Sequence, residues 1–301
     1  SPWRFLKWCF ALLTAGAIAG ALIGVVVFSL IYRRLPPVDQ LTDYRPSVPL
    51  RVWSADGKLI GEFGEERRDF VHLKDIPDYV KKAILAAEDD GFYSHPGIEI
   101  SGIARAAITN LITGRRAQGG STITQQVARN FFLSSERTYI RKLYEIAMSF
   151  KIERSLTKDQ ILEIYLNQIY LGQRAYGFQS AAKTYFGRPL DQISIGEAAT
   201  LAGLPVAPSA YNPIANPTRA TMRKNYVLRR MYELGYIDEV TYQAEKAQPM
   251  LTRRMPTEAE LLTDPSIENP NRVPASYAAE LVRMVMYDIF KEETYSRGLN
   301  V

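Results

Sequence analysis

Cysteine and histidine are nearly absent from this sequence of 301 residues. Cys9 is the single cysteine, which excludes a disulfide within the chain. Because there are only two histidines, a zinc site of cysteine and histidine ligands is not expected, and any metal would need carboxylates. The net charge of +5 is a mild basic excess that favours anionic partners without identifying one. We expect neither a nucleic-acid partner nor an organic cofactor.

Charged side chains are also missing from residues 8–32, a run of 25 residues that lies between Lys7 and the pair Arg33 and Arg34. As a helix this run is about 37 Å long, against about 30 Å for the hydrocarbon core of a bilayer. The run is too long for the apolar core of a cleaved signal peptide. We therefore predict a short stub and one transmembrane anchor over residues 1–34.

Three glycines, Gly16, Gly20 and Gly24, line one face of this predicted helix. Small residues at every fourth position let a second transmembrane helix approach closely, so this face is a candidate contact for a helical partner. The alternative is a Gly/Ala-rich helix that has no partner.

Beyond the anchor, the patterns predict a mainly α protein with one small β-hairpin. Residues 35–50 contain four prolines and are expected to form an extended connector. An Asp-Gly pair at residues 56–57 predicts a hairpin over residues 51–63. Apolar residues at helical spacing predict one helix that ends at Glu88. The same spacing predicts further helices over about 98–112, 121–132, 138–154, 158–171, 174–185, 194–203, 217–234 and 275–291. We assign residues 51–249 to the main domain and residues 250–301 to a proline-rich linker with the start of a further connection.

Three adjacent acids, Glu88, Asp89 and Asp90, stand where an apolar helix pattern stops. Asp75 is expected to cap this helix with Pro77 in its first turn, and the buried stripe of the helix reaches Glu88. Partial burial, the negative helix end and the neighbouring acids all disfavour the ionised form of Glu88, which favours a role as a base. The alternative is a solvated acidic cluster at a helix end.

Ser121, Gln125 and Arg129 fall on one face of a predicted helix that begins after two glycines. A helix start offers free backbone N–H groups, and this row adds side-chain donors that suit phosphate oxygens. The neighbouring Thr122 and Asn130 belong to the same polar segment. The alternative is an ordinary Ser/Thr cap with a polar outer face.

Arg141, Lys142 and Glu145 lie within about one turn of the next predicted helix. Such spacing is usually a surface ion pair worth a few tenths of a kcal/mol. Beside a second carboxylate and a row of phosphate-binding donors, however, the two cations suit a phosphate leaving group, and Glu145 suits a divalent metal.

Ser155 and Lys158 match the Ser-x-x-Lys pattern of penicillin-interacting nucleophiles, and we reject this reading. Thr157 and Gln160 predict a capping box at a helix start instead. The chain also has no Ser-Asp-Asn or Lys-Thr-Gly sequence to complete such a site.

Five motifs of the chain resemble, in the same order, those of glycosyltransferase family 51, the peptidoglycan polymerases. They are Glu88–Gly97, Gly120–Gln126, Arg141–Glu145, Ile161–Asn167 and Gly177–Phe186. The hairpin and the segment after Pro249 resemble class A penicillin-binding proteins of the 1A type. The chain would be the N-terminal part of such a protein, without its transpeptidase active site. Arg129 stands where the family more often has lysine, which keeps the cation.

The resemblance implies a lysozyme-like domain on the periplasmic side of a bacterial inner membrane. It implies lipid II and the growing glycan chain as substrates, membrane lipid as a neighbour, and moenomycin as an inhibitor. Glu88 would take the proton of the acceptor sugar's 4-hydroxyl, which displaces undecaprenyl pyrophosphate with inversion. Glu145 would be the second catalytic carboxylate and the candidate ligand of a Mg or Mn ion. The implied substrate-binding residues are Asp89, Ser121, Thr122, Gln125, Arg129, Asn130, Arg141 and Lys142.

Two other classes of function stay open at this point. A lysozyme-like hydrolase or lytic enzyme would also use two carboxylates, but it has no need for the donor row, the Arg-Lys pair or an anchor. A non-catalytic membrane scaffold would explain the anchor and the glycine face alone.

Overall fold

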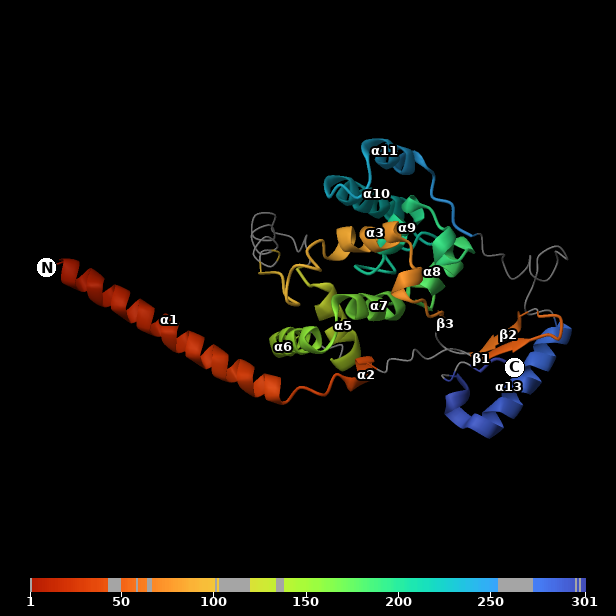
Figure 1. The fold of residues 1–301 in the computed structure, drawn as a ribbon, viewed down its shortest axis with the longest axis horizontal. Helices are drawn as coiled ribbons and strands as arrows, with labels where there is room; N and C mark the ends of the chain where they lie inside the picture. The colour runs from red at the N-terminus through yellow and green to blue at the C-terminus, as the bar shows by residue number, and fades with distance from the viewer. Residues whose placement is uncertain are drawn as a thin grey trace. The chain divides into compact units, whose positions relative to one another are not determined.

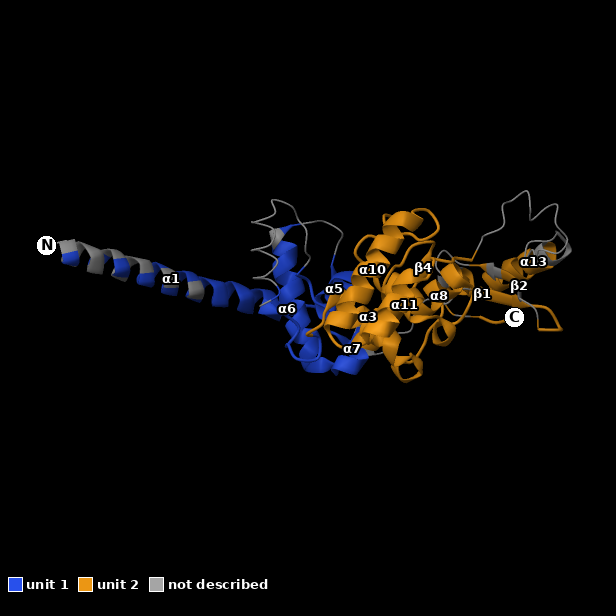
Figure 2. Ribbon diagram, turned by 90° about the horizontal axis from the view of Figure 1, so that it is seen from above, with its two compact units in different colours: residues 1–42, 92–161 blue, residues 43–91, 162–301 orange. Residues whose placement is uncertain are grey.

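The computed structural model describes residues 2–42, 50–57, 59–63, 67–100, 102, 120–133, 138–253, 273–295, 297 and 299–301. Within these ranges the protein is mainly α, with one apolar N-terminal helix and a small β-hairpin, as the sequence predicts (Figure 1). The chain forms two compact units, residues 1–42 with 92–161 and residues 43–91 with 162–301 (Figure 2). We call them unit 1 and unit 2 and describe each by itself.

Most helices and the hairpin lie close to the predicted ranges. The helices are α1 (Pro2–Arg33), α2 (Asp39–Thr42), α3 (Asp78–Glu88), α5 (Ile123–Phe132), α6 (Tyr139–Ser155), α7 (Lys158–Gln168), α8 (Phe178–Phe186), α9 (Ile195–Ala202), α10 (Pro217–Glu233), α11 (Glu239–Ala247) and α13 (Val273–Phe290). The strands are β1 (Leu50–Trp53), β2 (Leu59–Phe63), β3 (Arg67–Arg68) and β4 (Ala175–Tyr176), and short 3-10 turns cover Leu73–Asp75, Leu190–Gln192 and Lys291–Tyr295. Of these elements, α2, α11, β3 and β4 were not predicted. The connector over residues 35–50 is not extended throughout, since it contains α2. Most of the helix predicted over residues 98–112 lies outside the described residues.

In unit 1, α1 contains a segment, Thr14–Arg33, that is long and apolar enough to cross a membrane and has none of its residues buried. Its last turns pack against α6, where the Phe28 and Phe150 rings meet edge to face at 6.1 Å. Lys151 donates hydrogen bonds to the carbonyl oxygens of Leu35 and Pro36, at 3.1 and 2.8 Å. Ring packing and these hydrogen bonds therefore hold the end of the apolar helix against α6.

The core of unit 1 lies where α5 packs against α6. Ile123 and Val127 from α5 and Met148 and Ile152 from α6 are fully buried. α5 begins with the capping box of Thr122 and Gln125, in which each side chain accepts a hydrogen bond from the other residue's backbone N–H. This cap fixes where the polar row of α5 starts.

In unit 2, α3 packs against α9 and α10, and α10 also packs against α11. The stripe of α3 is buried as predicted, with Val80 and Ile84 fully enclosed. The predicted cap is wrong: Asp75 ends a 3-10 turn, and Pro77 occupies the N-cap position of α3. Asp75 fails as a cap because the extended backbone of Ile76 and Pro77 separates it from the first helical turn.

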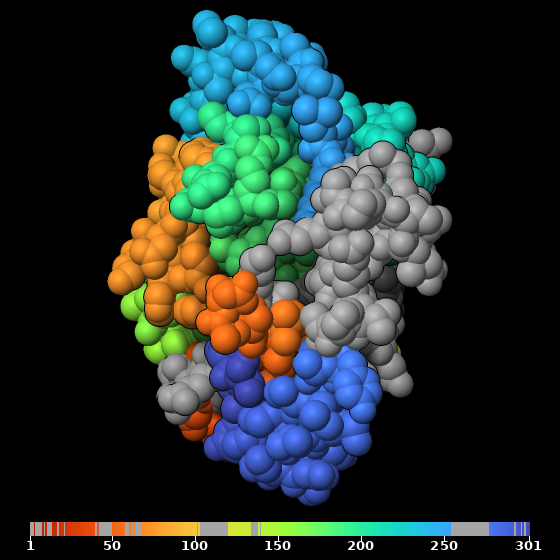
Figure 3. Space-filling view, turned by 90° about the vertical axis from the view of Figure 1, so that its right-hand side faces the viewer, coloured from red at the N-terminus to blue at the C-terminus, as the bar shows by residue number. Residues whose placement is uncertain are grey.

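The same unit holds the hairpin of the antiparallel strands β1 and β2. The hairpin packs against α13, and Figure 3 shows its residues in orange beside those of α13 in blue. Leu50 and Val52 form a small buried cluster with Ala279 of α13. A Cβ added at Gly61 would lie 2.7 Å from the Ala279 Cβ, so only glycine permits this close approach. The domain boundaries assigned from the sequence stay a prediction.

Candidate active site

The candidate base, Glu88, is the last residue of α3 in unit 2. Its side chain is half-buried, and its Oε1 atom is closed off from solvent. This arrangement follows from the buried stripe of α3, which carries the helix end into the core of the unit. A carboxylate with one buried oxygen is held in a defined position, as a general base must be.

The two acids after Glu88 have different surroundings. Asp89 is buried and terminates α3, its backbone N–H donating to the Leu85 carbonyl oxygen. Asp90 is exposed and forms an ion pair of 2.7 Å with Arg230 of α10. The solvated acidic cluster considered as an alternative therefore describes Asp90 but not Glu88 or Asp89.

In unit 1, four of the predicted site residues meet around the Lys142 ammonium group. Lys142 Nζ donates to a Glu145 carboxylate oxygen, to Ser121 Oγ at 3.0 Å and to Gln125 Oε1 at 3.4 Å. An ammonium group has three N–H donors, and here each has an acceptor. Arg141 and Lys142 were both considered as partners of Glu145, and in the structure Lys142 forms the ion pair.

Glu145 is 1% exposed, so its charge lies in the interior of unit 1 next to a cation. Gln125 is fully buried, and its Nε2 atom has no hydrogen-bond partner among the described residues. Arg141 Nε is likewise buried and without a partner in that part of the chain. Because a buried donor without an acceptor costs about 1–3 kcal/mol, these two N–H groups mark places where a bound acceptor would be stabilised.

The remaining predicted residues of this segment differ in their surroundings. Thr122 uses its hydroxyl twice, accepting from the Gln125 backbone and donating to the Gly97 carbonyl oxygen at 2.7 Å. Arg129 and Arg141 are half-buried, and Asn130 at the far end of the row is exposed. The row that begins at Ser121 therefore runs from the buried Lys142 cluster toward the surface.

A second polar cluster, centred on Glu153 of α6, is absent from the sequence-based predictions. Glu153 accepts from Thr124 Oγ1 at 2.5 Å and from Lys158 Nζ at 2.7 Å. Lys158 Nζ also donates to the His95 carbonyl oxygen at 2.7 Å. Spacing rules do not find this cluster because Glu153 and Lys158 are five residues apart, across the turn between α6 and α7.

This cluster also settles the Ser-x-x-Lys pattern. Lys158 is occupied by Glu153 and His95, and Ser155 Oγ donates to the Lys151 carbonyl oxygen. Thr157 and Gln160 form the predicted capping box at the start of α7. The predicted capping box is confirmed, and the partners of Ser155 and Lys158 support the rejection of this pattern as a nucleophile.

We expect Glu153→Ala to lower the free energy of unfolding by about 1–3 kcal/mol, because it leaves the Lys158 ammonium group short of its charged acceptor. Glu153 and Lys158 side chains are only 10% and 20% exposed, so water replaces the lost contact poorly. Glu153→Gln keeps an acceptor oxygen and should lose less. The measurement is denaturant unfolding of the full chain in detergent, and an alanine variant as stable as wild type would contradict this role.

A dedicated metal site does not fit the described residues. Among them, no group of three or more His, Cys, Asp or Glu side chains is placed to hold an ion. Glu145 already faces the Lys142 ammonium group, which supplies the positive charge at that carboxylate. We therefore assign no chemical step to a metal.

Comparison with known proteins agrees with these features. The profile of a family described as Transglycosylase matches residues 56–232, which include Glu88 and the whole Lys142 cluster. Penicillin-binding protein 1A of Neisseria meningitidis is 44% identical over 298 residues, or 99% of this chain and 36% of that protein. Penicillin-binding protein 1A of Pseudomonas aeruginosa is 43% identical, over 99% of this chain and 34% of its own length.

Among solved structures, the crystal structure of penicillin-binding protein 1A from Haemophilus influenzae is similar at a TM-score of 0.49 and 29% identity. The match covers 85% of this chain and 27% of that chain. The chain thus spans about a third of the length of the relatives it matches. Because the family profile covers more than half of the chain, the chain belongs to the Transglycosylase family.

Proposed function

We propose that this chain is a peptidoglycan glycosyltransferase that polymerises lipid II and releases undecaprenyl pyrophosphate. Membership of the Transglycosylase family and the penicillin-binding relatives support this reaction class. The observation that carries the proposal is the Lys142 cluster, in which an ammonium group, a buried carboxylate and a buried amide donor lie together. Such a group suits a pyrophosphate leaving group.

In the proposed reaction, Glu88 takes the proton from the 4-hydroxyl of the acceptor sugar. The oxygen forms a bond to the anomeric carbon of the growing chain, and the bond from that carbon to the pyrophosphate oxygen breaks. Attack from the opposite face inverts the anomeric centre. Lys142, Arg141 and Arg129 stabilise the negative charge that develops on the departing pyrophosphate, and Ser121 and Gln125 help to hold substrate.

Glu145 has a different role from Glu88 in this proposal. A retaining hydrolase needs its second carboxylate as a nucleophile, and an inverting one needs it beside a water. Glu145 is 1% exposed and paired with Lys142, which favours a role in positioning the ammonium group instead. This difference argues against the hydrolase alternative.

The membrane part of the proposal rests on α1. We propose that α1 anchors the chain in a bacterial inner membrane as a single pass, with the catalytic domain on the periplasmic side, where a lipid-linked substrate is reached. The three glycines remain the candidate contact for a second helix: a Cβ added at Gly16, Gly20 or Gly24 would meet nothing within 4 Å. The Mg or Mn ion considered for Glu145 stays a prediction, and the proposed reaction assigns no step to it.

The test is incubation of the purified full chain with lipid II, and separately with purified cell wall. We expect glycan strands from lipid II, blocked by moenomycin, and no soluble fragments from cell wall. Fragments from cell wall without strand growth would favour the hydrolase, and inactivity on both substrates would favour the scaffold.

A further inference from the structure

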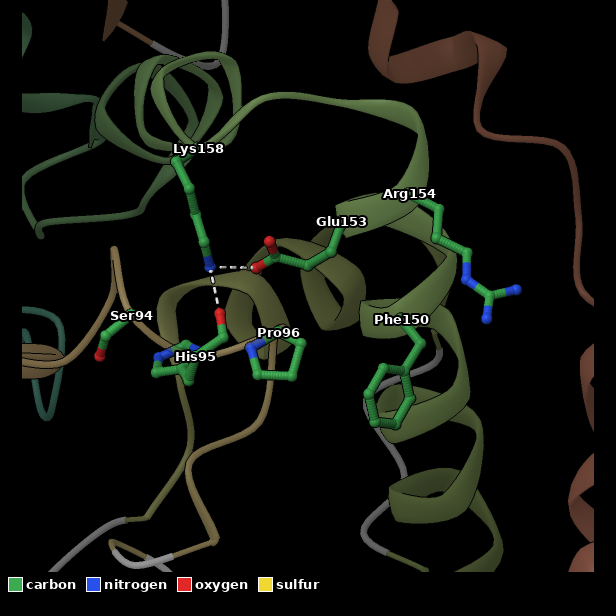
Figure 4. Close-up of a pocket in the computed structure, with 7 residues that line it drawn as sticks. All are labelled: Ser94, His95, Pro96, Phe150, Glu153, Arg154 and Lys158. Atoms are coloured by element: carbon green, nitrogen blue, oxygen red, sulfur yellow. Dashed lines mark hydrogen bonds and ion pairs between the residues drawn. The ribbon is translucent and has the colours of Figure 1, made fainter.

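A pocket of about 510 Å³ opens in unit 1 beside the end of the apolar helix (Figure 4). Its lining comprises Ser94, His95, Pro96, Phe150, Glu153, Arg154 and Lys158. The volume lies within the range of about 300–1,000 Å³ that is usual for small-molecule sites. The proposed reaction uses none of these side chains.

The pocket shares two wall residues with the contact between α1 and α6. Phe150 meets the Phe28 ring of α1, and the Arg154 guanidinium carbon lies 5.8 Å from the centre of the Tyr32 ring. Phe28 and Tyr32 occupy the last turns of α1, which ends in Arg33. If α1 crosses a membrane, aromatic and basic residues at its end lie at the level of the lipid headgroups, and so does this side of the pocket.

The described lining of the pocket carries two cationic side chains, Arg154 and Lys158, and one carboxylate, Glu153. Lys158 and Glu153 form an ion pair at 2.7 Å on one wall, and Glu153 is the only acid among the described lining residues. Arg154 extends away from this pair, and its Nη1 atom donates a hydrogen bond of 3.5 Å to the Tyr32 hydroxyl. None of the ion pairs among the described residues includes Arg154. Arg33 and Arg34 at the end of α1 and Lys151 on α6 add further positive charge to the same junction.

We propose that this pocket binds the phosphate headgroup of an anionic phospholipid, with Arg154 as the principal contact and Phe150 against the adjoining apolar part of the lipid. Guanidinium groups bind phosphate oxygens through paired N–H donors. Such a lipid would brace the junction of α1 and α6 at the membrane surface. The proposal depends on α1 being a membrane helix, and it is independent of the catalytic proposal.

The test uses the full chain in a neutral detergent, with dioctanoyl phosphatidylglycerol as the probe. The thermal unfolding temperature is measured against probe concentration, and dioctanoyl phosphatidylcholine and inorganic phosphate are measured in parallel. We expect a saturable rise with phosphatidylglycerol and at least tenfold weaker apparent binding of the other two. Equal binding of phosphatidylcholine would contradict recognition of the headgroup charge, and equal binding of inorganic phosphate would contradict a lipid ligand.

Variants locate the site. We expect Arg154→Gln to weaken phosphatidylglycerol binding about tenfold or more, and Arg154→Lys to weaken it less, since lysine keeps the charge. The matched control is Arg219→Gln, which removes an exposed arginine of α10 in unit 2. Because Arg154 is exposed, its loss should leave the unfolding temperature without lipid nearly unchanged. Wild-type binding by Arg154→Gln, or an equal loss in Arg219→Gln, would overturn the assignment.

Discussion

Glu88→Gln is expected to lower the rate of chain growth from lipid II by about 10²- to 10⁴-fold while the protein stays folded. The amide keeps the size of the side chain and its place at the end of α3, but it cannot accept the proton of the acceptor hydroxyl. The measurement is the initial rate of polymerisation, together with the unfolding temperature.

The matched control for this change is Asp90→Asn. Asp90 lies two residues further along, but it is exposed and paired with Arg230, so its substitution should change the rate less than about twofold. A Glu88→Gln enzyme with a rate within a factor of two of wild type would remove Glu88 from the role of base. Equal losses in both variants would point to the charge of the segment as a whole.

Lys142→Met is expected to damage both stability and activity. Glu145 is 1% exposed, and loss of Lys142 leaves its carboxylate without its cation. Breaking a fully buried pair costs about 3–5 kcal/mol, and since Lys142 is 40% exposed, we expect about 2–4 kcal/mol of unfolding free energy. The missing cation should also slow chain growth by about 10²- to 10³-fold.

The double variant Lys142→Met with Glu145→Gln separates these two effects. Removal of the second charge should restore most of the stability, whereas chain growth should stay slow. The control is Lys183→Met: Lys183 is 49% exposed, and its partner Asp69 keeps an ion pair of 2.6 Å with Arg51, so the loss should be below about 1 kcal/mol. A double variant as unstable as the single one would contradict the ion-pair explanation, and recovery of activity would contradict the role of the cation.

Helices were predictable from the sequence where apolar spacing and a cap agree. α5, α9 and α10 lie within two residues of their predicted bounds, since a Thr or Ser capping box or a proline in the first turn marks each start. α8 begins later than predicted because Gly177 has a positive φ of 83° and ends the preceding irregular segment. A Cβ at Gly177 would lie 2.8 Å from the Asn167 carbonyl oxygen, a tertiary contact that apolar spacing does not reveal.

The candidate site was predictable to the extent that it depends on helical neighbours. Lys142 and Glu145 are three residues apart on α6, and their pairing follows from that spacing. Their contacts to Ser121 and Gln125 require the packing of α5 on α6, which spacing along one helix does not reveal. The Glu153 cluster depends on the turn between α6 and α7, so no local sequence pattern predicted it.

In the proposed reaction, sugar transfer occurs from a pyrophosphate-linked donor. The most direct measurement is the amount of undecaprenyl pyrophosphate released for each disaccharide added, by mass spectrometry of reactions of the full chain with purified lipid II. We predict one molecule released per disaccharide joined, and almost none with Glu88→Gln. Soluble sugar fragments without matching release of undecaprenyl pyrophosphate would contradict this account.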